Sequence, residues 1–229
     1  MVKRGREIIE VFEKSAPSYD DWYRKPIGVY AFRSELKGLR DLLPSSGLGL
    51  DVGAGTGIFA QQLSTDERKI VCIEPSLGML KEAKKRNLQV IAATAETFPL
   101  RPMIIDFAYM VTVIEFLPEP LKALRAIGES LKEDATLVIL FINKESSWGE
   151  HYSKLAEKGD PIFSHARLYT LGDMCSLFER ACYDPQEFLG TLTASPDEPG
   201  EEVKLVPISS GAGVILIKAR KKRIRNPIG

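Results

Sequence analysis

Three glycines within five residues follow a short apolar run. In residues 50–57, LDVGAGTG, a buried strand is expected to pass straight into a turn, and a helix is expected from Ile58. Glycine has no Cβ, so the backbone of such a turn can approach a ligand closely. The first N–H groups of the following helix have no partner within that helix and face the same space. The segment predicts a site for a carboxylate or a phosphate, with a purely structural turn as the alternative.

An acidic residue follows the next apolar run. Glu74 stands at the carboxyl end of residues 70–73, directly before Pro75. In nucleotide-binding α/β sheets, an acid at this position accepts hydrogen bonds from both hydroxyls of a ribose. Taken alone, Glu74 could equally be a solvated carboxylate at a strand end. Together with the glycine turn, it predicts a site for a nucleoside cofactor.

The elements that position these residues are visible in the apolar pattern. Five runs rich in Val, Ile and Leu lack strict alternation, which is typical of parallel strands buried on both faces. Ser76 is expected to cap one connecting helix and Pro120 to open another. Two more helices are expected near residues 148–158 and 171–182, and two more strands near 187–193 and 214–219. The five runs are residues 48–52, 70–73, 88–92, 104–113 and 135–142.

Composition narrows the function classes. The 229 residues contain 31 Lys+Arg and 31 Asp+Glu, and this balance argues against a surface built to bind nucleic acid. The three cysteines have no CxxC spacing, and Cys175 and Cys182 would lie about 10.5 Å apart along one helix, too far to share a metal, so both are expected in the core. No apolar stretch reaches about 18 residues and no signal-peptide pattern opens the chain. We therefore expect a cytoplasmic protein with no metal and no membrane insertion.

Several segments together resemble the class I S-adenosylmethionine-dependent methyltransferases. They are LDVGAGTG, CIEPSLGMLKEAKKR at 72–86, ATAETFPL at 93–100 and the stretch 104–139, in the order and spacing of that family. FEKSAPSYDDWY at 12–23 is similar to the segment that precedes the glycine turn in many small-molecule members. The resemblance implies an α/β, Rossmann-like three-layer sandwich whose mostly parallel seven-stranded sheet has an antiparallel last strand. One methyltransferase domain over 1–229 is expected: an N-terminal helical lid segment (1–45), a cofactor-binding core (46–143), and substrate-side helices with the final strands (144–229).

The resemblance also implies the cofactor, S-adenosylmethionine (SAM), with S-adenosylhomocysteine as its product. It places the glycine turn at the methionine end, Glu74 at the ribose, and Met79 against the adenine ring, although core packing is an equal alternative for Met79. Thr94 stands where the family commonly has Asp, which leaves Ala95 and Glu96 for the adenine edge. The residues expected to bind the cofactor are Asp51, Gly53, Ala54, Gly55, Gly57, Glu74, Pro75, Met79, Thr94, Ala95, Glu96 and Val111.

The family's reaction is an in-line SN2 transfer of a methyl group to a nucleophile. The candidates near the acceptor are Tyr19, as a lid tyrosine or as aromatic packing, Glu115, which could orient an amine or a hydroxyl, and His151, for which a structural or surface role is favoured. They form no decisive constellation, so the small-molecule acceptor, any catalytic base and the oligomeric state stay open. The alternatives are a non-catalytic cofactor-binding homologue, supported by Thr94, and an NAD(P)-dependent oxidoreductase, whose site shares the glycine turn and the acid.

Overall fold

The computed structural model describes residues 3–198, 200–208 and 211–222. Seven strands form one sheet in the order β3-β2-β1-β4-β5-β7-β6. The first five in chain order pair in parallel, and the last strand, β7, lies between β5 and β6 and is antiparallel to both. This confirms the expected Rossmann-like sheet and its antiparallel last strand. The strands are β1 (Gly47–Val52), β2 (Arg68–Glu74), β3 (Gln89–Ala92), β4 (Ile105–Val111), β5 (Leu131–Ile142), β6 (Tyr183–Thr191) and β7 (Val214–Lys221).

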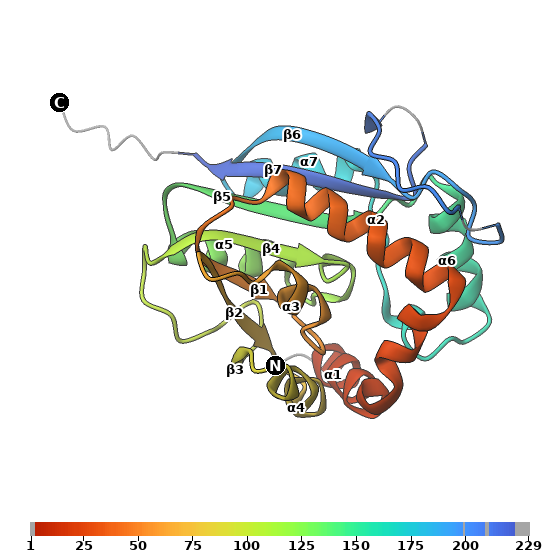
Figure 1. Cartoon of the computed structure of the whole chain (residues 1–229), viewed down its shortest axis with the longest axis horizontal. Coiled ribbons are helices and arrows are strands. Elements are labelled where there is room, and N and C mark those ends of the chain that lie inside the picture. Colours follow the sequence, from red (N-terminus) through yellow and green to blue (C-terminus); the bar gives the residue numbers. More distant parts are fainter. Residues whose placement is uncertain (1–2, 199, 209–210, 223–229) are drawn as a thin grey trace.

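Helices cover both faces of the sheet (Figure 1). α2 and α3 lie over one face, and α5 and α7 lie over the other. Ser76 caps α4, since its side chain accepts the N–H of Met79, and Pro120 opens α5, as the sequence predicts. The helices are α1 (Lys3–Ser15), α2 (Pro26–Leu42), α3 (Ile58–Leu63), α4 (Leu77–Lys85), α5 (Pro120–Ser130), α6 (Ser147–Glu157) and α7 (Leu171–Arg180), with 3-10 turns η1 (Ala16–Arg24), η2 (Ile114–Phe116) and η3 (Phe163–His165).

The core forms two apolar layers, one on each face of the sheet. The centre of β5 shows this most clearly, because residues 137–140 are all completely buried. Leu137 and Ile139 pack in the layer under α5 and α7, whereas Val138 and Leu140 pack in the layer under α2. Burial on both faces explains why the run carries no alternation of apolar and polar residues.

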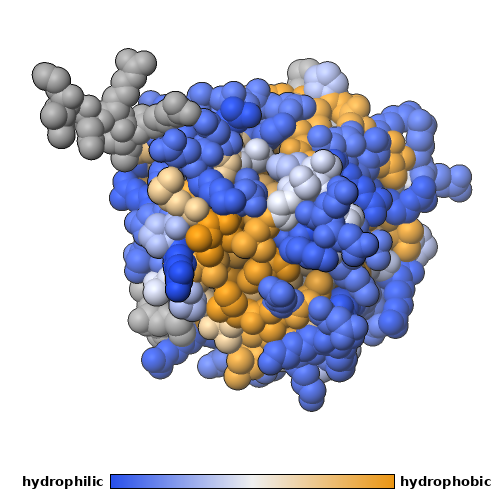
Figure 2. Space-filling view, turned by 60° about the vertical axis from the view of Figure 1, so that its left-hand side comes forward, coloured by the Kyte–Doolittle hydropathy of each residue, from blue (hydrophilic) through white to orange (hydrophobic). Residues whose placement is uncertain are grey.

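The crossover from β3 to β4 differs from the others, because residues 93–104, all of them described, form no helix. Leu100 and Ile104 are only half-buried against the core, and Met103 is 54% exposed. Figure 2 brings this side of the molecule forward and shows a broad apolar surface surrounded by hydrophilic residues.

The cysteine interpretation is only partly confirmed. Cys72 is completely buried in β2, but Cys175 is half-buried and Cys182 is exposed. The predicted helix over 171–182 ends at Arg180, because Cys182 adopts a left-handed backbone conformation (φ 61°). The prediction of a core position for Cys182 is therefore wrong. In the described part of the chain, no group of His, Cys, Asp and Glu is arranged to hold a metal ion.

Among the described helices, none combines the length and the apolar character that crossing a membrane requires.

Candidate functional site

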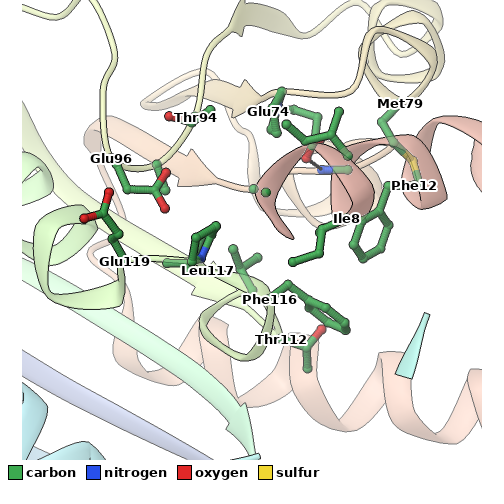
Figure 3. A pocket seen from close by; sticks show the side chains of 18 of the residues that line it. Ile8, Phe12, Glu74, Met79, Thr94, Glu96, Thr112, Phe116, Leu117 and Glu119 are labelled. Atoms are coloured by element: carbon green, nitrogen blue, oxygen red, sulfur yellow. Dashed lines mark hydrogen bonds between the residues drawn. The ribbon is translucent and has the colours of Figure 1, made fainter. Parts of the chain in front are cut away.

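A pocket of about 390 Å³ opens at the carboxyl ends of β1, β2 and β4. Its size is in the usual range for a small-molecule site. Figure 3 shows Ile8 and Phe12 of α1 facing it, with Thr94 and Glu96 from the segment after β3 on another side. α1 therefore covers the opening. The sequence-predicted residues that line the pocket are Tyr19, Gly53, Gly55, Glu74, Pro75, Met79, Thr94, Ala95, Glu96 and Val111.

The three glycines of the turn all adopt a left-handed backbone, but their surroundings differ. A Cβ on Gly53 would lie 2.6 Å from two methyl carbons of Val113, and one on Gly57 would lie 2.4 Å from Leu88 Cδ1. A Cβ on Gly55 would meet no atom within 4 Å. Gly55 thus presents open backbone to the pocket, whereas Gly53 and Gly57 are also required by packing.

Glu74 is the best-held polar group of the pocket. Its Oε2 accepts the N–H of Gly55 at 3.1 Å, and its Oε1 accepts the N–H of Ser76 at 2.9 Å. Burial raises the pKa of this carboxyl to about 7, while the two backbone hydrogen bonds oppose that rise. A carboxylate has about four acceptor sites, so those left over are available to donors of a ligand.

Not every predicted residue reaches the pocket. Asp51 is buried beneath the turn, where its Oδ2 accepts the Tyr109 hydroxyl at 2.9 Å, and burial raises its pKa to about 7. Ala54 donates its N–H to Ile73 O at 3.0 Å, and Gly57 packs against α4. These residues shape the turn from below, without lining the pocket.

The segment after β3 forms a tight turn at the pocket wall. Thr97 donates its N–H to Thr94 O at 3.2 Å, and Ala95 is buried between them. Oε1 of Glu96 is buried and has no hydrogen-bond partner in the described part of the protein. A ligand with a hydrogen-bond donor, for example an amino group, would give such an oxygen the partner that it lacks. Met79 is nearly fully buried and still lines the pocket, so its packing and ligand-facing interpretations are compatible.

α1 is fastened over the pocket by an acid that sequence reasoning missed. Oε2 of Glu13 accepts the Ser76 hydroxyl at 2.6 Å and the Gly78 N–H at 2.8 Å, and these bonds lower the pKa of Glu13. In the following η1, Asp20 accepts the Thr56 hydroxyl at 2.7 Å and pairs with Arg86. The N-terminal segment is therefore tied to the start of α4 and to the glycine turn.

Two further buried acids, Glu115 and Glu35, do not line the pocket. Glu115 is completely buried; its Oε1 accepts the Ile142 N–H at 2.8 Å, and burial raises its pKa to about 7. Glu35 of α2 is 6% exposed, and burial, followed by the charge of Glu115, raises its pKa to about 8. Glu35 was not predicted, since one Glu on an amphipathic helix gives no signal. His151 is half-buried on α6, with its ring 5.4 Å from that of Tyr152, and does not line the pocket.

These buried carboxyls predict that stability falls as pH rises from about 5 to 8. A raised pKa means that the folded state binds more protons than the unfolded state in this window, so the free energy of unfolding declines, by at most about 1.4 kcal/mol per pH unit for each group. Urea unfolding at pH 5, 6.5 and 8 measures the slope. Carboxyls with a lowered pKa, such as Asp106, change the free energy of unfolding only at pH values below this window.

Glu35→Gln should flatten this dependence, whereas Glu157→Gln, at an exposed position on α6, should not. A free energy of unfolding that stays constant or rises from pH 5 to 8 would contradict the assignment of raised pKa values.

Comparison with known proteins agrees with this arrangement. Residues 50–139 match the family described as "Methyltransferase domain". An uncharacterised protein of Methanocaldococcus jannaschii is 32% identical over 150 residues, which make up 66% of this chain and 70% of that protein. A demethylmenaquinone methyltransferase of Corynebacterium kroppenstedtii is 25% identical over 139 residues, 60% of each chain.

A solved structure extends the similarity over nearly the whole fold. The crystal structure of a SAM-dependent methyltransferase from Thermotoga maritima, described as a possible histamine N-methyltransferase, has a TM-score of 0.83 and 32% sequence identity. The alignment covers 94% of this chain and 100% of that chain. With the glycine turn, the acid after β2 and the antiparallel β7 all in place, the chain belongs to the SAM-dependent methyltransferase family.

Proposed function

We propose that this protein binds SAM in the pocket beneath α1 and transfers its methyl group to a small-molecule acceptor, releasing S-adenosylhomocysteine. The observation that carries the proposal is Glu74: a buried carboxylate at the end of β2, fixed by the N–H groups of Gly55 and Ser76 and lining the pocket. A carboxylate so placed suits the two hydroxyls of a ribose.

The other walls suit the remaining parts of the cofactor. On the adenine side, Met79 and Ala95 give apolar contact and the unpaired Oε1 of Glu96 gives an acceptor for an amino group. This assigns to Glu96 the role that Thr94 cannot perform. On the methionine side, Gly55 leaves space for the ligand, with Asp51 below it. Val111 lines the pocket at the end of β4.

The three segments of the chain expected from the sequence have separate roles in this proposal. Residues 1–45 act as a lid, 46–143 hold the cofactor and 144–229 complete the acceptor side; the limits at 1 and 229 lie outside the described residues. The pocket-lining side chains of the lid include Ile8, Ile9 and Phe12, which exclude water from the reacting centre.

Methyl transfer from SAM does not require the protein to form a covalent bond with either reactant. SAM supplies a methyl group already activated by a positive sulfur. The chain's own task is to orient the acceptor in line with that methyl group and to keep water away. Tyr19 lines the pocket, so it is positioned to close over the reactants, whereas Glu115 lies behind the wall. A base is needed only for an acceptor that carries a proton of high pKa.

Calorimetric titration with S-adenosylhomocysteine tests the proposal, with NADH as the control ligand. Saturable binding of S-adenosylhomocysteine alone is expected. The absence of such binding at millimolar ligand, or binding of NADH in its place, would overturn the assignment. Transfer of a methyl group to one acceptor then separates an enzyme from a non-catalytic cofactor-binding homologue.

Because α1 acts as a lid in this proposal, we expect Glu13→Ala to change the rate at which the ligand dissociates. Loss of the hydrogen bonds to Ser76 and Gly78 should free α1 more often, so S-adenosylhomocysteine should dissociate at least threefold faster, as measured by stopped-flow displacement. Glu10→Ala, at an exposed position on the same helix, is the matched control. Equal dissociation rates in both variants would show that Glu13 does not hold the lid.

A further inference from the structure

A groove between α5 and α7 has no role in the proposed methyl transfer. Both helices cover the same face of the sheet (Figure 1), and the groove between them has a volume of about 530 Å³, which is in the usual range for a small-molecule site. Arg167 and Tyr169, from the segment that leads into α7, also line it. The groove adjoins the cofactor pocket at the start of α5, where Glu119 and Lys122 line both cavities.

The lining of this α5–α7 groove carries an excess of positive charge. The whole chain has equal numbers of basic and acidic residues, so the excess is local. A lining with two more bases than acids is complementary to a ligand that carries two negative charges. The charged residues of the lining are the bases Lys122, Arg125, Arg167 and Arg180 and the acids Glu119 and Asp173.

Both acids of the groove are already engaged by other groups. Oδ2 of Asp173 accepts the N–H of Thr170 at 3.0 Å and its hydroxyl at 2.9 Å, as part of the cap of α7. Oε2 of Glu119 lies 3.7 Å from Nζ of Lys122. None of the ion pairs within the described part of the chain includes one of the three arginines of the groove. Their guanidinium groups are therefore left to solvent or to a ligand.

Two of these arginines are held in place while most of their donors stay free. Nη2 of Arg125 donates to Arg180 O at 3.2 Å, which links α5 to the end of α7. Cζ of Arg167 lies 5.2 Å from the centroid of the Tyr169 ring, and the Arg167 backbone N–H donates to Glu115 O at 2.8 Å. A guanidinium group carries five N–H donors in a planar fork that matches the oxygens of a phosphate group. Because these side chains are already positioned, they lose less conformational entropy when a ligand binds.

We propose that the α5–α7 groove binds a small molecule that carries a phosphate group, and that Arg125, Arg167 and Arg180 bind this group. A phosphate monoester carries nearly two negative charges above neutral pH, because its second pKa is about 6. That charge matches the excess of the lining.

The rest of the groove suits the organic part of such a ligand. Leu121 and Leu177 lie in the same lining and offer apolar contact. A nucleic acid would need basic residues along a much longer surface, whereas here the excess is confined to one groove. The site is separate from the glycine turn and Glu74, so the inference stands whether or not the protein transfers methyl groups.

Calorimetric titration in Tris-chloride at constant ionic strength tests the inference. The probes are phenyl phosphate and inorganic phosphate, with phenol as the neutral counterpart. We expect saturable binding of phenyl phosphate and no binding of phenol at millimolar concentration. Arg125→Gln and Arg167→Gln should each weaken the binding of phenyl phosphate by about tenfold or more, because each removes hydrogen bonds between charged groups. Arg33→Gln, at an exposed position on α2 over the opposite face of the sheet, should bind like the wild type.

Each outcome of these titrations has a definite meaning. Inorganic phosphate that binds as tightly as phenyl phosphate would identify free phosphate as the ligand, and weaker binding of inorganic phosphate would identify a monoester. No saturable binding of either phosphate at millimolar concentration would overturn the inference. Binding that survives unchanged in Arg125→Gln and Arg167→Gln, or that Arg33→Gln weakens equally, would overturn it as well.

Two features keep this test independent of folding and of the proposed function. Both substituted arginines of the groove are exposed, and an unchanged midpoint of thermal unfolding shows that each variant is folded. Neither SAM nor S-adenosylhomocysteine is present in the titrations, so a failure of the methyl-donor proposal and a failure of this inference are seen separately.

Discussion

Replacement of Glu74 by glutamine should weaken the binding of S-adenosylhomocysteine by about 10- to 100-fold. The carboxylate accepts two backbone N–H groups, from Gly55 and Ser76, and in the proposed site its remaining lone pairs accept the ribose hydroxyls. Glutamine keeps the shape, but its NH₂ group faces a donor, so at least one charge-assisted hydrogen bond is lost. Such bonds contribute about 1.5–3 kcal/mol, and about 1.4 kcal/mol corresponds to a tenfold change in Kd.

Calorimetric titration of wild type, Glu74→Gln and Glu67→Gln measures the effect. Glu67 is exposed in the turn before β2 and serves as the matched control, so its variant should bind like the wild type. Equal Kd values for all three proteins would show that Glu74 does not contact the ligand.

A pair of glycine substitutions should separate ligand binding from stability. Gly55→Ala and Gly57→Ala both place a Cβ on a left-handed backbone, at a similar strain of about 1 kcal/mol. Only at Gly57 would that Cβ clash, 2.4 Å from Leu88 Cδ1 and 3.2 Å from Ala83 Cβ. At Gly55 it would enter the space proposed for the cofactor.

Gly55→Ala should therefore lose at least tenfold in affinity for S-adenosylhomocysteine, with a modest loss of stability. Gly57→Ala should lose a further 1–3 kcal/mol or so of stability through overpacking. Urea unfolding and calorimetry on both variants give the two quantities. Unchanged ligand affinity in Gly55→Ala would contradict the proposed position of the cofactor.

The features that sequence reasoning predicts well are those determined by local chemistry. The centre of β5 is recognisable because residues 137–140 are buried on both faces and so carry no polar positions. Ser76 marks a helix start because its side-chain oxygen accepts a free N–H of the first turn. Pro120 marks another because proline has no N–H that would need a partner there. The glycine turn and Glu74 follow from the geometry of strand ends, and Gly53, Gly55 and Glu74 line the pocket.

The features that it misses depend on contacts between distant segments. Glu13 lies 63 residues from Ser76, and nothing in the pattern of α1 shows that these side chains meet. Glu35 reads as an ordinary polar position of a helix, although it is buried. The end of α7 before Cys182 depends on one left-handed residue, which an apolar spacing cannot reveal.

A crystal structure of the protein with S-adenosylhomocysteine would show directly whether Glu74 holds the ribose of the ligand. We expect both ribose hydroxyls within about 2.6–3.2 Å of the Glu74 carboxylate oxygens, the adenine between Met79 and Ala95, and the homocysteine portion passing over Gly55. A ligand bound elsewhere, or a ribose out of reach of Glu74, would contradict the assignment of this pocket as the methyl-donor site.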